Sequence, residues 1–471
     1  MKKYIRYIAI IMITVLVFGR LGKVLEANHD GNQAMNGFYK LDRNTVDVMF
    51  YGSSHIYAGV NTVSLWDEYG IAAYDLAGTM QTLWNSYYNM EETLKYQTPK
   101  VMVVDVYGAL IEEEYYTSTN VIKNASSMRF STNKIKNIWS SVTHEEFLSY
   151  LLSYPLMHDS YREITKGNYV RGSDKIGGKW YKGFNPSFAI TVYDKLPEVT
   201  EITEKKQPSE KNKKYLEKMV EMAQKQQIEL VFIVVPYEGW QEKDESIYAW
   251  IEEFAADNDI RFFNGNRNLD KMGFDSATDY AEASHLNYSG ACKFTHYFGH
   301  WLKENYELKD HRGEELYQSW QEYSDCWAAY QRNSELSQIN DLNAYIKALK
   351  QGKEYVIFVS VDYKYKDNLF VNMLEELSDV DPYSFDNNGT YVIESGNLLY
   401  KTPDEPNYLW YMETDCLDIA VVRNYGEDMK IVVNNVEQNN NYNDVTILVY
   451  DKKLDMIADV VAYNRDGTLI R

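Results

Sequence analysis

The sequence predicts an α/β fold built on a parallel sheet, followed by a C-terminal α+β domain rich in strands. Five short apolar runs predict the sheet strands, and they lie at 46–51, 72–76, 101–106, 230–235 and 260–263. Helical segments such as Val60–Tyr69 and Leu83–Tyr96 separate these runs. Strands that alternate with helices pair in parallel, and helices cover both faces of such a sheet.

A long insertion, residues 108–210, separates the third and fourth runs. It is rich in tyrosine, tryptophan, serine and lysine, and its charged end, Pro197–Lys214, has the composition of an exposed linker. Insertions of this length in an α/β domain usually form a lid or a substrate platform. We therefore expect a sheet domain at 44–308 that carries such an insertion.

The composition changes after residue 308. Residues 309–351 are charged and helical in pattern, which predicts a helical connector. The remaining segment, 352–471, contains short strand-like runs at 355–361, 391–394, 419–422, 429–433, 445–450 and 457–463. Turn residues separate these runs, so the pattern predicts a separate α+β domain.

The bulk composition limits the function classes. The chain has 471 residues, of which 45% are hydrophobic, so sizeable cores can form. Its net charge of −21 argues against a nucleic-acid partner, because phosphate binding needs a basic surface. A neutral glycan, or a polymer held by local positive spots, fits this charge better. The widely spaced Cys292, Cys326 and Cys416 predict free thiols rather than a disulfide framework.

Residues 1–27 have the pattern of a targeting segment. Cations at positions 2, 3 and 6 precede the apolar run Tyr7–Phe18, and no small-x-small cleavage site follows. As a helix, Tyr4–Val24 would span about 31 Å. We expect an uncleaved single-pass anchor in the cell membrane rather than a cleaved signal peptide. Residues 28–43 would form a polar spacer, and the bulk of the chain would be extracytoplasmic.

The strongest local signal is the segment Gly52-Ser53-Ser54-His55, at the end of the first predicted strand. A strand that leads into a helix places a hydroxyl at the carboxyl edge of the sheet, where open α/β sheets bind ligands. Gly52 allows a tight turn, and the first N–H groups of the helix could stabilise an oxyanion. On its own, a Gly-Ser-Ser at a strand end is more often an ordinary helix cap.

A second signal follows the last predicted strand, where Asp279, Glu282 and His285 lie just ahead of a helix. Either carboxylate can orient the imidazole through one ring nitrogen, while the other nitrogen accepts a proton from a serine hydroxyl. A lone histidine would more often be structural, but its pairing with the Ser54 segment predicts catalysis. We place Glu282 ahead of Asp279 as the orienting acid.

Over about Asp47–Tyr306 these segments resemble the SGNH (GDSL-type) hydrolase superfamily. Gly52–His55 matches the nucleophile block, which implies that Ser54 is the nucleophile. Asp75–Gln81 matches the second block, whose Gly78 would supply an oxyanion N–H, and Ser284–Asn287 matches the last block, whose His285 would be the base. The resemblance implies a flavodoxin-like sheet. More closely, the chain looks like exported, membrane-anchored members that accompany membrane-bound O-acyltransferases, including the D-alanyl-lipoteichoic-acid assembly protein.

Two departures from the family pattern concern the oxyanion site and the acid. The Gly-x-Asn-Asp of the third block is absent, since the strand runs into Asp105-Val-Tyr-Gly108. The third oxyanion donor must come from elsewhere, and Gln81 and Asn85 are our candidates. The acid is Glu282 where the family has aspartate, and its extra methylene still allows the orienting role.

The C-terminal domain is similar, in Leu342–Leu377 and Val445–Val460, to the interleukin-like epithelial–mesenchymal-transition-inducer (EMT-inducer) domain. Relatives of that domain occur as glycan-binding stem modules. The resemblance implies a module that presents a polysaccharide to the serine site, and a purely structural domain is the alternative.

These features predict an extracytoplasmic acyl (O-acetyl) transferase or esterase that acts on a cell-surface polysaccharide. Its expected partners are the glycan, a membrane-bound O-acyltransferase and the cell membrane. No cofactor or metal is expected, because no phosphate-binding glycine loop is present and His296 and His300 lack a third ligand. The alternative is a catalytically inactive scaffold of the same fold that binds glycan and partners a membrane O-acyltransferase.

Overall fold

The structure is a computed structural model. It describes positions 6, 7, 10, 13, 14 and 17 and residues 30–115, 124–125, 127–152, 182–199, 204–361, 368–378, 389–402, 405, 407–415, 417–425, 429–438 and 445–471. The chain divides into an N-terminal unit, Met1–Asp174 with Lys179–Ser324, and a C-terminal unit that holds Asp325–Arg471. The division falls inside the segment predicted as a helical connector, within helix α14 (Gln318–Gln338).

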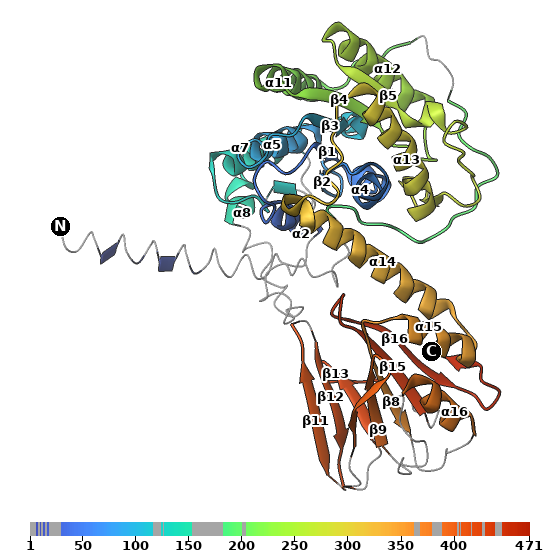
Figure 1. Cartoon of the computed structure of the whole chain (residues 1–471). Helices are drawn as coiled ribbons and strands as arrows, with labels where there is room; N and C mark the ends of the chain where they lie inside the picture. Colours follow the sequence, from blue (N-terminus) through green and yellow to red (C-terminus); the bar gives the residue numbers. More distant parts are fainter. Residues whose placement is uncertain are drawn as a thin grey trace. The chain divides into compact units, whose positions relative to one another are not determined.

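A five-stranded parallel sheet forms the centre of the N-terminal unit (Figure 1). Its strands are β1 (Val48–Gly52), β2 (Ala73–Ala77), β3 (Val101–Asp105), β4 (Glu229–Val234) and β5 (Arg261–Asn264), and their order is β2-β1-β3-β4-β5. This is the strand order of flavodoxin-like doubly wound sheets. The predicted α/β fold with a parallel sheet is therefore confirmed.

Helices cover both faces of this sheet, and each strand contributes to both cores. Met102 and Val104 of β3 pack on one face with α5 (Leu83–Thr93), α11 (Glu210–Gln226) and α12 (Glu242–Asp257). Val101 and Val103 pack on the other face with α3 (Ser54–Gly59), α4 (Thr62–Tyr69) and α13 (Tyr288–Asn305). Because neither face of the sheet meets water, the strands are continuous apolar runs in the sequence.

Local sequence sets where these helices begin. Asn61, Thr82, Ser209 and Asn287 each accept a backbone N–H of the first turn that follows, which is the usual role of a helix N-cap. The shorter helices of the unit are η1 (Val106–Leu110), α7 (Thr132–Ser141), α8 (Phe147–Leu152), η4 (Gly265–Asn268) and η5 (Glu315–Tyr317). The helix α4 ends at Gly70 in the left-handed conformation.

Part of the predicted spacer is folded, which corrects the sequence prediction for 28–43. Residues Asp30–Phe38 form helix α2, whose Met35 and Phe38 belong to the core on the α5 side of the sheet. The Tyr74 hydroxyl donates to the Ala34 carbonyl at 2.6 Å. The segment has only three apolar residues, Ala34, Met35 and Phe38, among polar ones, so its sequence did not indicate a buried face.

The predicted membrane anchor, 1–27, lies almost wholly outside the described residues. In the part of the chain that the structure describes, no helix is both long and apolar enough to cross a bilayer. Cys292 is a free thiol, Cys326 is buried, and Cys416 lies outside the described residues.

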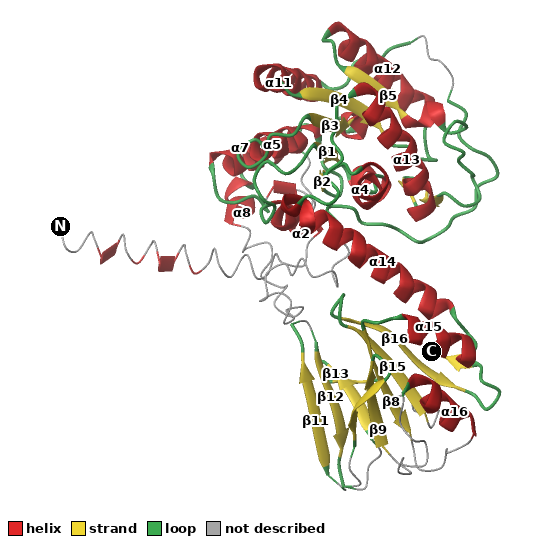
Figure 2. Cartoon of the chain, in the orientation of Figure 1, coloured by secondary structure: helices red, strands yellow, loops and turns green. Residues whose placement is uncertain are grey.

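The C-terminal unit contains two antiparallel sheets with helices, which confirms the predicted strand-rich α+β domain (Figure 2). One sheet has the order β10-β9-β8-β15-β16-β17, with strands Asn397–Lys401, Gly389–Glu394, Tyr355–Val361, Val445–Asp451, Met456–Tyr463 and Leu469–Ile470. The other has the order β11-β12-β13-β14, with strands Tyr408–Glu413, Asp418–Arg423, Lys430–Val433 and Val436–Glu437.

Helices α15 (Leu342–Gln351) and α16 (Asn368–Leu377) pack on one face of the larger sheet, and the smaller sheet packs on its other face. Strand β8 shows the division, since Ile357 and Val359 face the helices while Phe358 faces the smaller sheet. Strands β10 and β11 were not predicted from the sequence, and neither strand contains a fully buried residue.

Candidate active site

The turn after β1 places Ser54 at the carboxyl edge of the sheet. Strand β1 ends at Gly52, Ser53 accepts the N–H of His55 as the N-cap, and Ser54 is the first residue of α3. A Cβ atom at Gly52 would lie 2.8 Å from both Asp105 Cβ and Ile56 Cγ1. Real Cβ contacts do not come this close, so only glycine fits where β3 and α3 meet the turn.

A short hairpin brings an acid and a histidine together on the same edge. Strands β6 (Tyr280–Glu282) and β7 (His285–Leu286) flank a two-residue turn, and Glu282 is the direct cross-strand partner of His285. Directly opposed side chains in an antiparallel pair lie close enough to interact. The three-residue spacing seen in the sequence is thus the spacing of a tight hairpin.

Hydrogen bonds connect the serine, the histidine and the glutamate. The His285 Nε2 and Ser54 Oγ atoms are 2.6 Å apart, and His285 Nδ1 is hydrogen-bonded to Glu282 Oε1. The Ser284 N–H donates to the second Glu282 oxygen at 2.9 Å, which holds the carboxylate in place. In this geometry Nδ1 carries a proton and Nε2 can accept one from the serine hydroxyl.

Asp279, the alternative acid, lies in a different network. Its carboxylate pairs with Lys293 Nζ at 2.6 Å and accepts the Ser289 hydroxyl and the Asp275 N–H, both at 2.7 Å. Burial opposes ionisation of this carboxyl, but the hydrogen bonds from Lys293, Ser289 and Asp275 outweigh it and lower the pKa of Asp279. Asp279 therefore anchors the first turns of α13, which follows the hairpin, and does not contact His285.

Gln81 and Asn85 do not reach an oxyanion position, which corrects the sequence prediction. The Gln81 amide nitrogen donates to Leu76 O and Ser86 Oγ, and that of Asn85 donates to Asn137 Oδ1 and Ser141 Oγ. Both N–H groups of each amide are therefore used. The two residues connect β2, α5 and α7 instead, with each side chain at most 2% exposed.

Gly78 lies beside the nucleophile turn, but its N–H is engaged. It donates to the Gly52 carbonyl at 3.2 Å. A Cβ atom at Gly78 would lie 2.1 Å from Asn124 Oδ1, so the Asn124 amide covers this glycine. One Asn124 N–H donates to Thr79 O at 3.0 Å, and its Oδ1 atom has no donor among the described residues. Asn124 lies in the insertion, where no sequence motif singles it out.

His55 packs among aromatic side chains next to Ser54 and His285. Its ring stacks on Tyr107 with centroids 3.9 Å apart, and the rings of Tyr237 and His285 lie at 5.1 and 5.6 Å. Burial, and to a lesser extent the neighbouring His285, hold the pKa of His55 well below its usual range. His55 therefore stays neutral, so it does not compete electrostatically with the imidazolium that His285 would form.

The end of the insertion is hydrogen-bonded to the β6–β7 hairpin that carries Glu282 and His285. Residues 184–193 run alongside it, and the Thr191 N–H and hydroxyl donate to the carbonyls of Tyr280 and Ala281 at 2.9 and 2.7 Å. Further along, the Tyr288 N–H donates to Ser187 O at 2.7 Å. This part of the predicted lid or platform thus positions the hairpin that carries His285.

Metal-binding residues do not cluster in the described part of the chain. No group of three or more His, Cys, Asp or Glu side chains there could hold a metal ion. His296 pairs with Glu68, and His300 pairs with Glu304. Both pairs lie at the surface.

Asp105 lies beneath the nucleophile turn, at the end of β3. Burial raises the pKa of its carboxyl to about 7, although the Tyr107 and Val235 N–H groups and the Ser53 hydroxyl act in the opposite direction. None of these donors reaches hydrogen-bonding geometry with either carboxyl oxygen. Ionisation of Asp105 therefore leaves a poorly solvated charge under the turn.

Solved structures similar to the chain include two bacterial proteins. One is described as a lipolytic protein of the G-D-S-L family from Desulfitobacterium hafniense, with 12% identity, a TM-score of 0.29, and coverage of 55% of this chain and 99% of that one. The other is described as an acylhydrolase from Bacteroides fragilis, with 14% identity, a TM-score of 0.28, and coverage of 57% and 94%. No protein-family model and no curated protein matches the chain.

The two acids should respond differently to loss of charge. Glu282→Gln is expected to lower kcat/KM about tenfold or more while leaving the melting temperature unchanged, because Glu282 is exposed and contacts His285. Asp279→Asn is expected to lower the stability by about 1.5–3 kcal/mol with a smaller effect on turnover. Parallel measurements of ester turnover and thermal unfolding check this. The reverse pattern would identify Asp279 as the orienting acid.

Asp105 predicts a pH dependence of stability. Its pKa is raised in the folded state, so its contribution to stability is present at low pH and lost as the pH rises from about 4 to about 7. Asp105→Asn removes that loss. The melting temperature of Asp105→Asn minus that of the wild type should therefore increase as the pH rises through this range. Exposed Asp257→Asn is the control. A constant difference between Asp105→Asn and the wild type would contradict the raised pKa.

Proposed function

We propose that the protein is a serine-dependent acyl esterase or acyl transferase. Ser54 is the nucleophile, His285 the general base and Glu282 the acid that orients the histidine. The observation that carries the proposal is the chain of hydrogen bonds from Ser54 Oγ through both His285 nitrogens to Glu282, at the carboxyl edge of a parallel sheet. A hydroxyl, an imidazole and a carboxylate connected in this order form the arrangement that activates a serine.

In the first half-reaction His285 Nε2 takes the proton from Ser54 Oγ as that oxygen attacks the acyl carbonyl carbon. Glu282 stabilises the resulting imidazolium. When the tetrahedral intermediate collapses, the bond to the alcohol oxygen breaks and His285 returns the proton to the leaving alkoxide. Water or a sugar hydroxyl then attacks the acyl-serine ester and loses its proton to His285. The bond between the acyl carbon and Ser54 Oγ breaks, and His285 returns the proton to that oxygen. The products are the free acid or a new ester.

The negative oxygen of the intermediate needs hydrogen-bond donors. The Ser54 N–H lies in the first turn of α3, where N–H groups have no intrahelical acceptor. In place of Gln81 and Asn85, the Asn124 amide is our candidate for another donor, and it would donate once its side chain turns, because its Oδ1 atom lies over Gly78. The Gly78 N–H would contribute once its bond to Gly52 O opens on substrate binding.

We place the reaction at the outer face of the cell membrane, on O-acyl groups of a cell-surface polysaccharide, with a membrane-bound O-acyltransferase as partner. The apolar N-terminal segment and the sequence blocks around Ser54 and His285 support this setting. The O-acetyl group is the proposed acyl group. In the C-terminal unit, the resemblance to the EMT-inducer domain supports a role in holding the glycan.

A catalytically inactive scaffold that binds glycan is the second candidate. The bond from the Gly78 N–H to Gly52 O favours it, because this donor is not free to stabilise an oxyanion. An activated serine without sufficient oxyanion donors gains little rate. The scaffold would keep the fold and the glycan contacts but form no acyl-serine.

Substitution of Ser54 or His285 distinguishes the enzyme from the inactive scaffold. Ser54→Ala should abolish labelling by a fluorophosphonate probe and lower the turnover of a chromogenic acetyl ester by about 10³-fold or more, and His285→Ala nearly as much, because nucleophile and base act as a unit. Ser53→Ala is the matched control and should still be labelled. Labelling that persists in Ser54→Ala would place the chemistry elsewhere, and an unlabelled wild type would favour the scaffold.

A further inference from the structure

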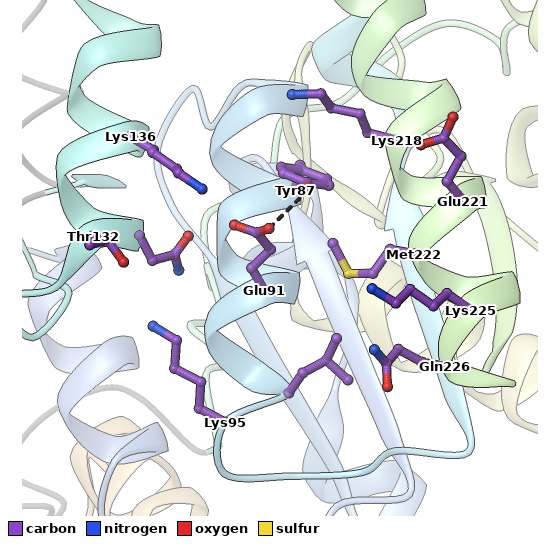
Figure 3. A pocket seen from close by; sticks show the side chains of 12 residues that line it. Tyr87, Glu91, Lys95, Thr132, Lys136, Lys218, Glu221, Met222, Lys225 and Gln226 are labelled. Carbon is purple, nitrogen blue, oxygen red and sulfur yellow. Dashed lines mark hydrogen bonds between the residues drawn. The ribbon is translucent and has the colours of Figure 1, made fainter.

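A cavity of ≈ 490 Å³ lies among α5, α7 and α11 in the N-terminal unit (Figure 3). This volume is within the range of about 300–1,000 Å³ typical of small-ligand sites. Its lining comes largely from the C-terminal halves of α5 and α11, which lead into β3 and β4. The cavity therefore lies toward the amino edge of the sheet, away from the carboxyl edge that holds Ser54.

Four lysines line this cavity, although the chain carries a net charge of −21. Lys95 makes an ion pair with Glu92, and the Lys218 ammonium lies 5.2 Å from the ring centroid of Tyr87. Lys136 of α7 and Lys225 of α11 make no ion pair within the described ranges of the chain. Figure 3 shows both of these side chains directed toward the space between the helices.

Two carboxylates, Glu91 and Glu221, line the same cavity and offset part of this charge. The Tyr87 hydroxyl donates to Glu91 at 3.0 Å, which partly satisfies that carboxylate. The lysines remain in excess, and Lys136 and Lys225 come from helices on opposite sides of the cavity. An anion between Lys136 and Lys225 would interact with both.

A buried acceptor is the second feature of the cavity. Asn133 lines it and is only 5% exposed. Its amide nitrogen donates to Tyr88 O at 3.0 Å and to Glu92 Oε2 at 2.9 Å, which sets the orientation of the amide. Its Oδ1 atom has no donor among the described residues. An unpaired buried acceptor costs about 1–3 kcal/mol, and a hydroxyl group would satisfy it.

We propose that this cavity binds an anionic sugar, in which a phosphate or carboxylate group stands beside free hydroxyls. The anionic group would lie between Lys136 and Lys225, and a hydroxyl would donate to Asn133 Oδ1. A simple anion would use only the lysines, and a neutral sugar only the asparagine. Because the cavity lies away from Ser54, it would hold a ligand without reacting with it, and this site does not depend on the proposed function.

Calorimetric titration of the full chain at low salt tests the site. Glucose 6-phosphate should bind, while glucose and inorganic phosphate should each bind at least tenfold more weakly. The double variant Lys136→Glu/Lys225→Glu should lose glucose 6-phosphate binding at least tenfold, and Lys136→Gln/Lys225→Gln should lose less. Binding should weaken as salt screens the lysines.

The matched control is Lys214→Glu/Lys347→Glu, which makes the same change in net charge at exposed positions outside the cavity lining. It should bind glucose 6-phosphate as the wild type does, and so should Ser54→Ala. An equal loss in the control would overturn the site, because overall charge would then explain the binding. Equal affinity for glucose or for inorganic phosphate would also overturn it.

Discussion

The hydrogen bond between Ser54 Oγ and His285 Nε2 joins residues that lie 231 positions apart, and most of the N-terminal unit serves to hold them together. Ser54 follows the end of β1 in a parallel sheet, so it lies at the carboxyl edge. Leu286, next to His285, and Ile56, two residues after Ser54, belong to the same buried core as Phe294 and Phe298 of α13. The packing of α13 on α3 and α4 therefore sets the distance between the two side chains.

Burial around the site controls which groups carry charge. His55 stays neutral because burial lowers its pKa, and burial raises the pKa of Asp105 to about 7. Glu282, by contrast, is half-exposed on the hairpin and hydrogen-bonded to His285. The groups packed behind the nucleophile turn are thus held close to neutrality at moderately acid pH, while the carboxylate in contact with His285 faces water. This distribution suits a serine that must be activated by a single imidazole.

The strands of the parallel sheet could be predicted from the sequence, because buried strands are continuous apolar runs. The positions of Ser54 and His285 could be predicted as well, because each residue follows one of these runs. The choice between Glu282 and Asp279 depended on a two-residue hairpin, which left no periodic signal. The prediction that Gln81 or Asn85 is an oxyanion donor was wrong. The partners of the Asn85 amide, Asn137 and Ser141, are remote in sequence, so the sequence did not show that this amide is already engaged. Asn124 could not be found, since only tertiary folding places it over Gly78.

The central claim is that Ser54 forms a covalent acyl intermediate, and mass spectrometry of peptides after a rapid acid quench tests it most directly. The protein is mixed with an activated acetyl ester, quenched within the first turnover and digested. We expect one acetyl group on the peptide that carries Ser54, accumulation of this adduct in Glu282→Gln if deacylation slows, and no adduct in Ser54→Ala. An acetyl group on a different residue, or an unmodified Ser54 peptide while the wild type turns over the ester, would contradict the account.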